Sequence, residues 1–332
     1  MAVVYVREQG AIVRKHCARM LVEKDGEALL EIPLGKTDSV AVFGNVQVTT
    51  QALSELLERG IPLALYTRNG RLKGHLAPAL SKNVPLRLAQ YRMTVDEAAS
   101  LRIARAVVRA KLLNSAALAG DYRAHYPSAA LAEVQDALGG LAGKAAGAGT
   151  HAELLGYEGS GAAAYFRAFA GMNRSDLPFE GREKYPATDP INALLSLGYT
   201  LVMNELRGLV EGMGLEPHLG FLHRAEYGRP SLALDLLEPF RSVLVDRLAL
   251  RLVNERVLTG EDFGRRAGGA RAGGVVLLPE PFRKYLEMYE GAMNEPRRAA
   301  PEGMRAAVRA DAEKLAGAVR EGGEFRPYVE EV

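Results

Sequence analysis

The sequence contains a single cysteine, Cys17, and no tryptophan among its 332 residues. One thiol excludes a disulfide within the chain and a zinc site built from cysteines, and it fits a reducing cytoplasm. No stretch of about 18 apolar residues occurs, so we expect no membrane-spanning helix and no membrane partner. The N-terminus reaches the charge of Arg7 without the apolar core of a secretion signal. These absences predict a soluble, cytoplasmic protein.

A strong charge of either sign is also missing. The formal net charge is +2, with 25% charged and 48% hydrophobic residues, which is the composition of an ordinary globular protein. Any surface for nucleic acid would therefore have to be a local patch. The length predicts about two domains with sizeable cores.

Residues 1–78 have the pattern of a small β domain. Short β-branched runs alternate with turns, and Asp25-Gly26 and Asn69-Gly70 mark two hairpins. Thr49 can cap one helix that ends near Glu58. Because this part contains no cluster of titratable groups among apolar ones, we assign it to packing or subunit contact.

A linker is expected at residues 79–85, and from residue 86 to residue 332 the apolar residues recur at helical spacing. Thr94 and Glu97 predict a capping box inside the first helical stretch. A later helix is expected to end near Leu138, before a flexible glycine-rich connection. The fold class is thus α+β by segregation, with a small N-terminal β-sheet or sandwich domain and a larger all-α domain that carries the candidate site.

The first helical stretch is rich in positive charge. Between Lys82 and Arg123 there are eight Lys or Arg residues and three acids, and Arg102, Arg105 and Arg109 follow one another at helical spacing. Such a stripe suits a phosphate backbone. A solvated helix face is the alternative, and the stripe alone does not decide between them.

A second unusual segment extends from Glu216 to Arg241. His223 lies in its turn-rich first half, and an apolar run follows that is broken by Asp235 and followed by Glu238. These two acids are three residues apart and share one face of a helix. A buried carboxylate must be paired, protonated or metal-bound, whereas a solvated face would need none of these.

Three further residues stand out by their surroundings. Glu158 is the lone acid in a Gly- and Ala-rich stretch, where small side chains allow another backbone or a ligand to approach closely. Tyr165 follows it, as a packing residue or as a nucleophile. Asn192 lies among aliphatic residues near the start of a helix and needs a polar partner.

Glu158, His223, Asp235 and Glu238 together form the candidate catalytic constellation. Carboxylate oxygens with one imidazole favour Mn²⁺ or Mg²⁺ over Zn²⁺. Three protein ligands would leave open positions for phosphate oxygens, and the metal could then act as a Lewis acid on a phosphodiester.

Four ordered blocks of the sequence resemble a known family, the CRISPR-associated integrases of spacer acquisition. The blocks are LGYEGSGAAAYF (155–166), DPINALLSLGY (189–199), GFLH (220–223) and GRPSLALDLLEPFR (228–241). The segment NVPLRLAQYR (83–92) and the order of a β domain before a helical domain extend the resemblance over essentially the whole chain.

The resemblance implies a metal-dependent DNA endonuclease and integrase, in which a free 3′-OH of captured foreign DNA attacks a phosphodiester at the edge of the CRISPR repeat. It implies Glu158, His223 and Glu238 as metal ligands, with Asp235 in support; the family often has Asp where this chain has Glu238. The implied partners are double-stranded DNA, a second copy bound through the β domain, and a small CRISPR-associated protein whose dimer lies between two such homodimers.

The same resemblance turns several basic residues into candidates for contact with DNA phosphates, with plain surface charge as the alternative for each. They are Arg87, Arg92, Arg102, Arg105 and Arg109, and, nearer to the reacting phosphate, Arg229, Arg241 and Lys284. Phosphate contacts predict weak sequence preference and strong salt dependence. Two other functions stay open, a general metal-dependent nuclease without strand transfer and a non-catalytic DNA-binding scaffold.

Overall fold

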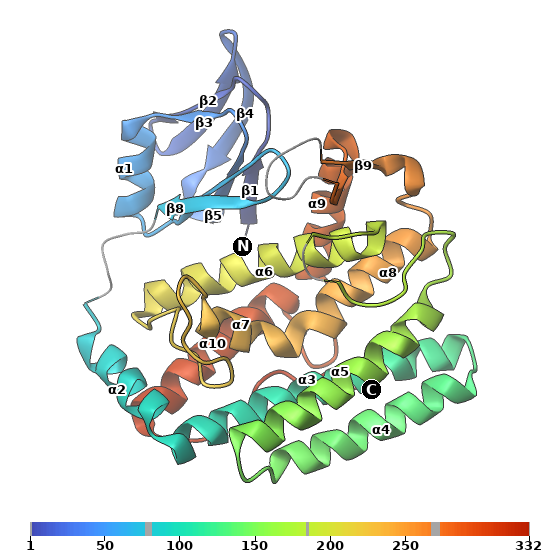
Figure 1. Cartoon of the computed structure of the whole chain (residues 1–332). Coiled ribbons are helices and arrows are strands. Elements are labelled where there is room, and N and C mark those ends of the chain that lie inside the picture. Colours follow the sequence, from blue (N-terminus) through green and yellow to red (C-terminus); the bar gives the residue numbers. More distant parts are fainter. Residues whose placement is uncertain (1, 77–81, 184–185, 267–272, 332) are drawn as a thin grey trace. The chain divides into compact units, whose positions relative to one another are not determined.

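The computed structural model describes residues 2–76, 82–183, 186–266 and 273–331, which belong to two compact units, residues 1–82 and 83–332 (Figure 1). The first unit consists mainly of strands and the second mainly of helices, so the predicted α+β fold with segregated parts is confirmed. Residues 79–81 of the predicted linker lie outside the described residues. Helix α2 begins at Val84, inside the stretch predicted as linker.

Two four-stranded sheets and one helix supply the core of the first unit. One sheet has the strand order β1-β5-β7-β8 and the other β4-β3-β2-β6. The core joins residues of both sheets to helix α1, for example Val13, Val42 and Leu56. The elements are β1 (Ala2–Val6), β2 (Ile12–His16), β3 (Arg19–Lys24), β4 (Glu27–Pro33), η1 (Leu34–Lys36), β5 (Thr37–Phe43), β6 (Gln47–Val48), α1 (Thr50–Glu58), β7 (Leu63–Tyr66) and β8 (Leu72–Leu76).

The predicted turn and cap of this unit have the expected geometry. Asp25 and Gly26 both have positive φ, 52° and 86°, as a two-residue hairpin turn requires. Thr49 precedes α1, and its side chain accepts a hydrogen bond from the backbone N–H of Ala52.

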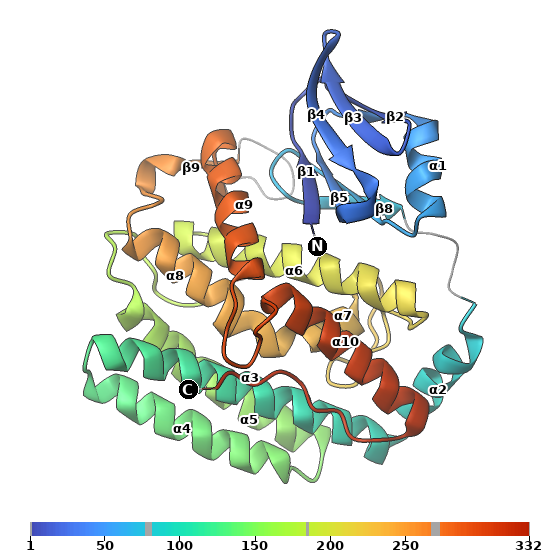
Figure 2. The same cartoon turned by 180° about the vertical axis from the view of Figure 1, so that it is seen from behind.

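The second unit is organised around α3 (Glu97–His125), a helix of 29 residues whose apolar side packs against α4 and α5 (Figures 1 and 2). None of the helices in the described ranges is long and apolar enough to cross a membrane. The other elements are α2 (Val84–Val95), α4 (Ala129–Ala146), α5 (His151–Met172), α6 (Pro190–Met213), α7 (Ser231–Leu237), η2 (Glu238–Phe240), a π-helical turn η3 (Arg241–Asp246), α8 (Arg247–Asn254), η4 (Gly260–Asp262), β9 (Phe263–Arg265), β10 (Val275–Leu277), α9 (Pro279–Asn294) and α10 (Met304–Glu321).

The helical unit differs from the sequence-based expectation in three places. Asp96, not Thr94, caps α3, because its side chain accepts from the N–H of Ala99, so the predicted capping box is wrong. Helix α4 continues past Leu138 to Ala146, because Leu138, Ala142 and Ala145 are buried and tertiary packing outweighs the low helix propensity of the glycines. The short strands β9 and β10 pair as an antiparallel hairpin within a part expected to be all helical.

The C-terminal segment after α10 has no regular structure and extends along α3 (Figure 2). Asn114 of α3 holds it there. The Asn114 Nδ2 donates to the carbonyl oxygens of Tyr328 at 3.0 Å and Pro239 at 2.6 Å, and its Oδ1 accepts from the N–H of Glu330 at 2.8 Å. The ring of Tyr328 stacks on Phe240, with 5.4 Å between the centroids. One buried amide therefore connects α3, the η2 turn and the C-terminal segment.

Asn114→Ala is expected to lower the free energy of unfolding by ~2–4 kcal/mol, because it leaves buried carbonyl and N–H groups without partners. Urea denaturation followed by circular dichroism measures the loss. Asn294→Ala is the matched control, since Asn294 is exposed and bonds only within its own helix end. Equal stability of the two variants would contradict the role given to Asn114.

Candidate active site

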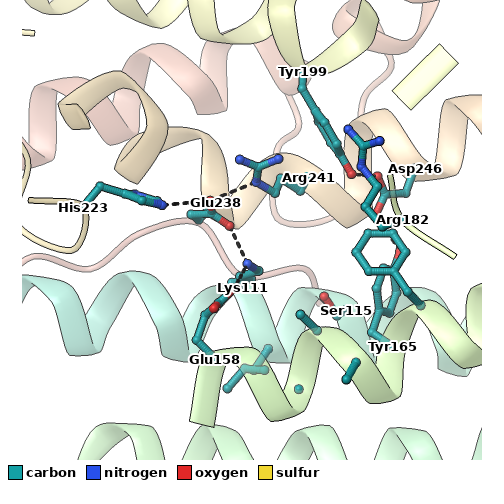
Figure 3. A pocket seen from close by; sticks show the side chains of 15 residues that line it. Lys111, Ser115, Glu158, Tyr165, Arg182, Tyr199, His223, Glu238, Arg241 and Asp246 are labelled. Carbon is teal, nitrogen blue, oxygen red and sulfur yellow. Dashed lines mark hydrogen bonds and ion pairs between the residues drawn. The ribbon is translucent and has the colours of Figure 1, made fainter. Parts of the chain in front are cut away.

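A pocket of about 400 Å³ in the helical unit brings together side chains from α3, α5, α6, the loop before α6 and the segment 223–246. The three residues predicted as metal ligands, Glu158, His223 and Glu238, all line it, as do Lys111 and Arg241 (Figure 3). Elements that are distant in sequence thus contribute to one site.

Glu158 reaches the pocket because α5 approaches α3 closely. At Gly161 an added Cβ would lie 2.2 Å from the Cδ2 of Leu112, so a larger residue would push the helices apart. Gly156 and Gly159 have no such neighbour within 4 Å. The close approach expected from the small residues is therefore made at Gly161, almost one helical turn after Glu158.

Asp235 is occupied in shaping the loop that carries His223. Its carboxylate accepts from the backbone N–H groups of Phe221 at 2.6 Å, Leu222 at 2.9 Å and His223 at 3.0 Å, and the His223 Nδ1 lies 2.7 Å from it. Gly220 makes room for this turn, because an added Cβ would lie 2.6 Å from the Asp235 Oδ2. Asp235 is 1% exposed. It orients the ring rather than lining the pocket.

The contact with Asp235 decides which imidazole nitrogen faces the pocket. An ionised carboxylate only accepts, so the proton of a neutral His223 belongs on Nδ1. The lone pair of Nε2 is then directed towards Glu238, whose Oε1 lies 3.9 Å away.

Glu238 is an ionised carboxylate at the centre of the site. It is 3% exposed, and the Arg241 Nε lies 3.0 Å from its Oε1. Burial by itself would raise the pKa of Glu238, but the charges of Arg241 and Lys111 hold that pKa well below its usual range. Its Oε2 has no aligned hydrogen-bond donor, although the Lys111 Nζ is 2.7 Å away.

Lys111 is one of the eight basic residues between Lys82 and Arg123, but unlike Arg102 and Arg109 it is not exposed. Its ammonium group forms ion pairs with both Glu158 and Glu238. Burial acts to lower the pKa of Lys111, but the two carboxylates outweigh it and keep the lysine charged. The signal was available in the helical phase: at 3.6 residues per turn, Lys111 lies about 200° around α3 from the exposed Arg109.

Asp246 forms the polar wall opposite Glu158 (Figure 3). Tyr165 donates to its Oδ2 at 2.7 Å and Tyr199 donates to its Oδ1. The π-helical turn η3 places Arg241 and Asp246 on the same pocket although they are five residues apart. Single π-helical turns of this kind are frequent at functional sites. Tyr165 is a hydrogen-bond donor to a buried acid here.

Asp246→Asn is expected to remove a contribution to stability that grows as the pH falls. Burial raises the pKa of Asp246 from 3.8 to about 6, against the opposing effect of the tyrosine hydroxyls and arginines. The folded state then holds a proton that the unfolded chain releases, so this group adds stability as the pH falls from about 7 to about 4. The contribution, ~3 kcal/mol over that range, should be absent in the variant.

Urea titrations at several pH values within that range measure the effect. The exposed Asp176→Asn, whose side chain is 96% accessible, should keep the wild-type pH dependence. Parallel curves for Asp246→Asn and the wild type would contradict the assignment.

Arg182 enters the pocket from the loop before α6, and a hydrogen bond to Asn192 helps to hold it there. The Asn192 Oδ1 accepts from the Arg182 Nη1 at 2.7 Å and from the N–H of Glu183 at 3.0 Å, while its Nδ2 donates to the carbonyl of Gly181. The Arg182 Nη2 also donates to Ser196 Oγ. These acceptors are uncharged, so the guanidinium brings a positive charge to the pocket. The need of Asn192 for a partner was predicted, but the partner was not.

Of the eight predicted DNA contacts, the pocket lining includes Arg241 alone. Arg229 pairs with Glu226, and Lys284 donates to the carbonyl of Val257. Along α2 and α3, Arg92, Arg102 and Arg109 are exposed, whereas Arg87 and Arg105 are half-buried.

The pocket carries the donor types of a site for a hard divalent cation. As the side chains stand, no three His, Cys, Asp or Glu residues of the described chain converge closely enough to hold a metal. The reason lies in the geometry of the pocket, where the Lys111 ammonium occupies the space between the two carboxylates. The donor set and the unaligned Oε2 of Glu238 fit a cation that replaces this ammonium.

Comparison with known proteins gives one consistent result. Residues 4–291 match the family described as CRISPR associated protein Cas1. The CRISPR-associated endonuclease Cas1 2 of Rhodospirillum rubrum is 38% identical over 306 residues, which cover 89% of this chain and 87% of that protein. The CRISPR-associated endonuclease Cas1 3 of Thermus thermophilus is 35% identical over 89% of this chain and 86% of that protein.

Among solved structures, a CAS1 protein from Thermotoga maritima superimposes with a TM-score of 0.82 at 26% identity, covering 99% of this chain and 100% of that one. The similarity therefore includes both units and the elements that form the pocket. This chain belongs to the Cas1 family of CRISPR-associated proteins.

Proposed function

We propose that this protein is a metal-dependent DNA endonuclease and integrase that inserts captured foreign DNA into a CRISPR array. The observation that carries the proposal is the convergence of Glu158, His223 and Glu238 on one pocket that also presents Arg241. Membership of the Cas1 family supports it, since relatives that are 38% and 35% identical are endonucleases by name.

Mn²⁺ or Mg²⁺ would be held by Glu158, His223 and Glu238. When bound, the cation would polarise a phosphodiester and stabilise the charge that develops on it during attack by a 3′-OH. Asp235 keeps the His223 proton on Nδ1, so that Nε2 is available as a ligand.

The positive side chains of the pocket position the DNA. Arg241 and Arg182 both line the pocket, and guanidinium groups bind phosphate oxygens through paired hydrogen bonds. The exposed arginines of α2 and α3 would add contacts to the DNA backbone that do not read sequence. We further propose that residues 1–78 form the homodimer contact, and that a small CRISPR-associated protein joins two dimers.

A joining assay tests the function. The protein is incubated with Mn²⁺, a labelled duplex with a free 3′-OH and a supercoiled plasmid that carries a CRISPR repeat. We expect label to enter the plasmid, and a duplex that ends in a dideoxynucleotide to give no joined product. The variant His223→Ala should lose joining while it keeps the wild-type fold.

The alternatives give different outcomes. Nicking of the plasmid with both duplexes, without transfer of label, would indicate a nuclease that lacks strand transfer. Binding of DNA without nicking or joining would indicate a scaffold, and joining by a folded His223→Ala would show that the site is misplaced.

A further inference from the structure

Lys111 is a charged residue on a face of α3 whose neighbouring residues are mostly buried. It projects from the centre of α3, and its ammonium is enclosed between one carboxylate of α5 and one of η2. Its side chain is only 15% accessible, and those of Glu158 and Glu238 are 23% and 4% accessible. This arrangement is an ion triad inside a pocket.

Within the triad, Lys111 compensates the negative charges of Glu158 and Glu238. Two carboxylates that face each other away from water repel, and burying either of them without a partner is costly. Arg241 compensates one oxygen of Glu238, at 3.0 Å, but Glu158 has no other ion-pair partner among the described residues. Without Lys111, these two acids would have to protonate or separate.

The positive charge of Lys111 lies where the proposed cation would have to lie. The two carboxylates that it joins are the two carboxylates proposed as metal ligands, so lysine and metal cannot both occupy the space between them. A lysine ammonium is a compact charge on a flexible stem. The pocket of about 400 Å³ next to it gives the ammonium room to move without repacking the core.

We propose that Lys111 is a built-in counter-cation that holds the site assembled without metal and is displaced when the divalent cation binds. The proposal rests on the proposed function. It makes Lys111 a positioning residue that stabilises the metal-free protein and weakens metal binding. The loss of a metal ligand would instead lower the affinity for the metal.

The first test compares Lys111→Met with the wild type by calorimetric titration with Mn²⁺ and by thermal unfolding with and without Mn²⁺. We expect the metal-free variant to melt at a lower temperature, to bind Mn²⁺ about tenfold more tightly or better, and to gain more in melting temperature from Mn²⁺ than the wild type. Arg109→Met is the matched control, because it removes an exposed cation two residues away on the same helix. It should change none of these values.

A second test needs no variant. The wild type is treated with a limiting amount of acetic anhydride, with and without Mn²⁺, and the acetylation of each lysine is measured by mass spectrometry. Lys111 is expected to become several-fold more reactive when Mn²⁺ is present, whereas the exposed Lys144 stays unchanged.

The outcomes separate this inference from the proposed function. If the wild type binds no Mn²⁺, both are wrong. If it binds Mn²⁺, but Lys111→Met binds it no more tightly and Lys111 is equally reactive in both conditions, the displacement is wrong and the metal site stands.

Discussion

Glu238→Gln is expected to lower the rate of DNA joining by at least about a hundredfold, because outer-shell partners of metal ligands alone are worth ten- to a hundredfold and Glu238 is proposed as a ligand itself. The change keeps the shape of the side chain and removes its charge. Joining of a labelled 3′-OH duplex to a repeat-carrying plasmid in Mn²⁺, measured as an initial rate, gives the size of the loss.

The same change should also affect stability. Lys111 and Arg241 both lose a charged partner in a buried position, at 2.7 Å and 3.0 Å respectively, and breaking a buried pair on one side costs about 3–5 kcal/mol. Glu255→Gln is the control, since Glu255 pairs with Arg251 on the surface. A Glu238→Gln protein that joins DNA within a few-fold of the wild-type rate would remove Glu238 from the site.

Asp235→Asn is expected to cost about 3 kcal/mol or more in unfolding free energy. The wild-type carboxylate accepts three backbone N–H groups and faces the His223 ring. An amide offers one oxygen to these donors and directs its own N–H₂ towards the others, so buried donors are left without partners. Joining should fall as well, because the loop that presents His223 loses its anchor.

Urea denaturation and the joining assay measure the two effects of Asp235→Asn together. The control is Asp136→Asn, which changes an exposed acid on α4 and should stay within about 0.5 kcal/mol of the wild type. If Asp235→Asn proved as stable as that control, the hydrogen bonds of Asp235 would have to be reassigned.

Two local signals of the β unit predicted their structure correctly, whereas the capping box expected at Thr94 and Glu97 is wrong. The Asp25-Gly26 turn and the Thr49 cap each depend on a few neighbouring residues, and each has the expected form. The end of α4 was missed because its glycines are held in the helix by packing on other helices. The strands β9 and β10 were missed because three-residue strands leave too short a pattern.

Glu158, His223 and Glu238 were predicted for the candidate site, because acids within apolar runs demand an explanation, and Arg241 followed from the family resemblance. Asp246, Lys111 and Arg182 also line the pocket and were not predicted there. Lys111 and Arg182 acquire their roles from partners elsewhere in the chain, Glu238 for the one and Asn192 for the other. Nothing in the neighbourhood of either residue distinguishes it from a surface charge, apart from the helical phase of Lys111.

The π-helical turn between α7 and α8 sets the direction in which α8 presents its side chains. In an ordinary α-helix each residue turns the chain by about 100°, so with the same residues in α-helical form Asp246 would lie roughly 140° around the axis from Arg241. Arg247 would then point away from Asp121, and Leu248 and Leu252, now buried, would turn towards water. The backbone form of these six residues therefore matters as much to α8 as their side chains do.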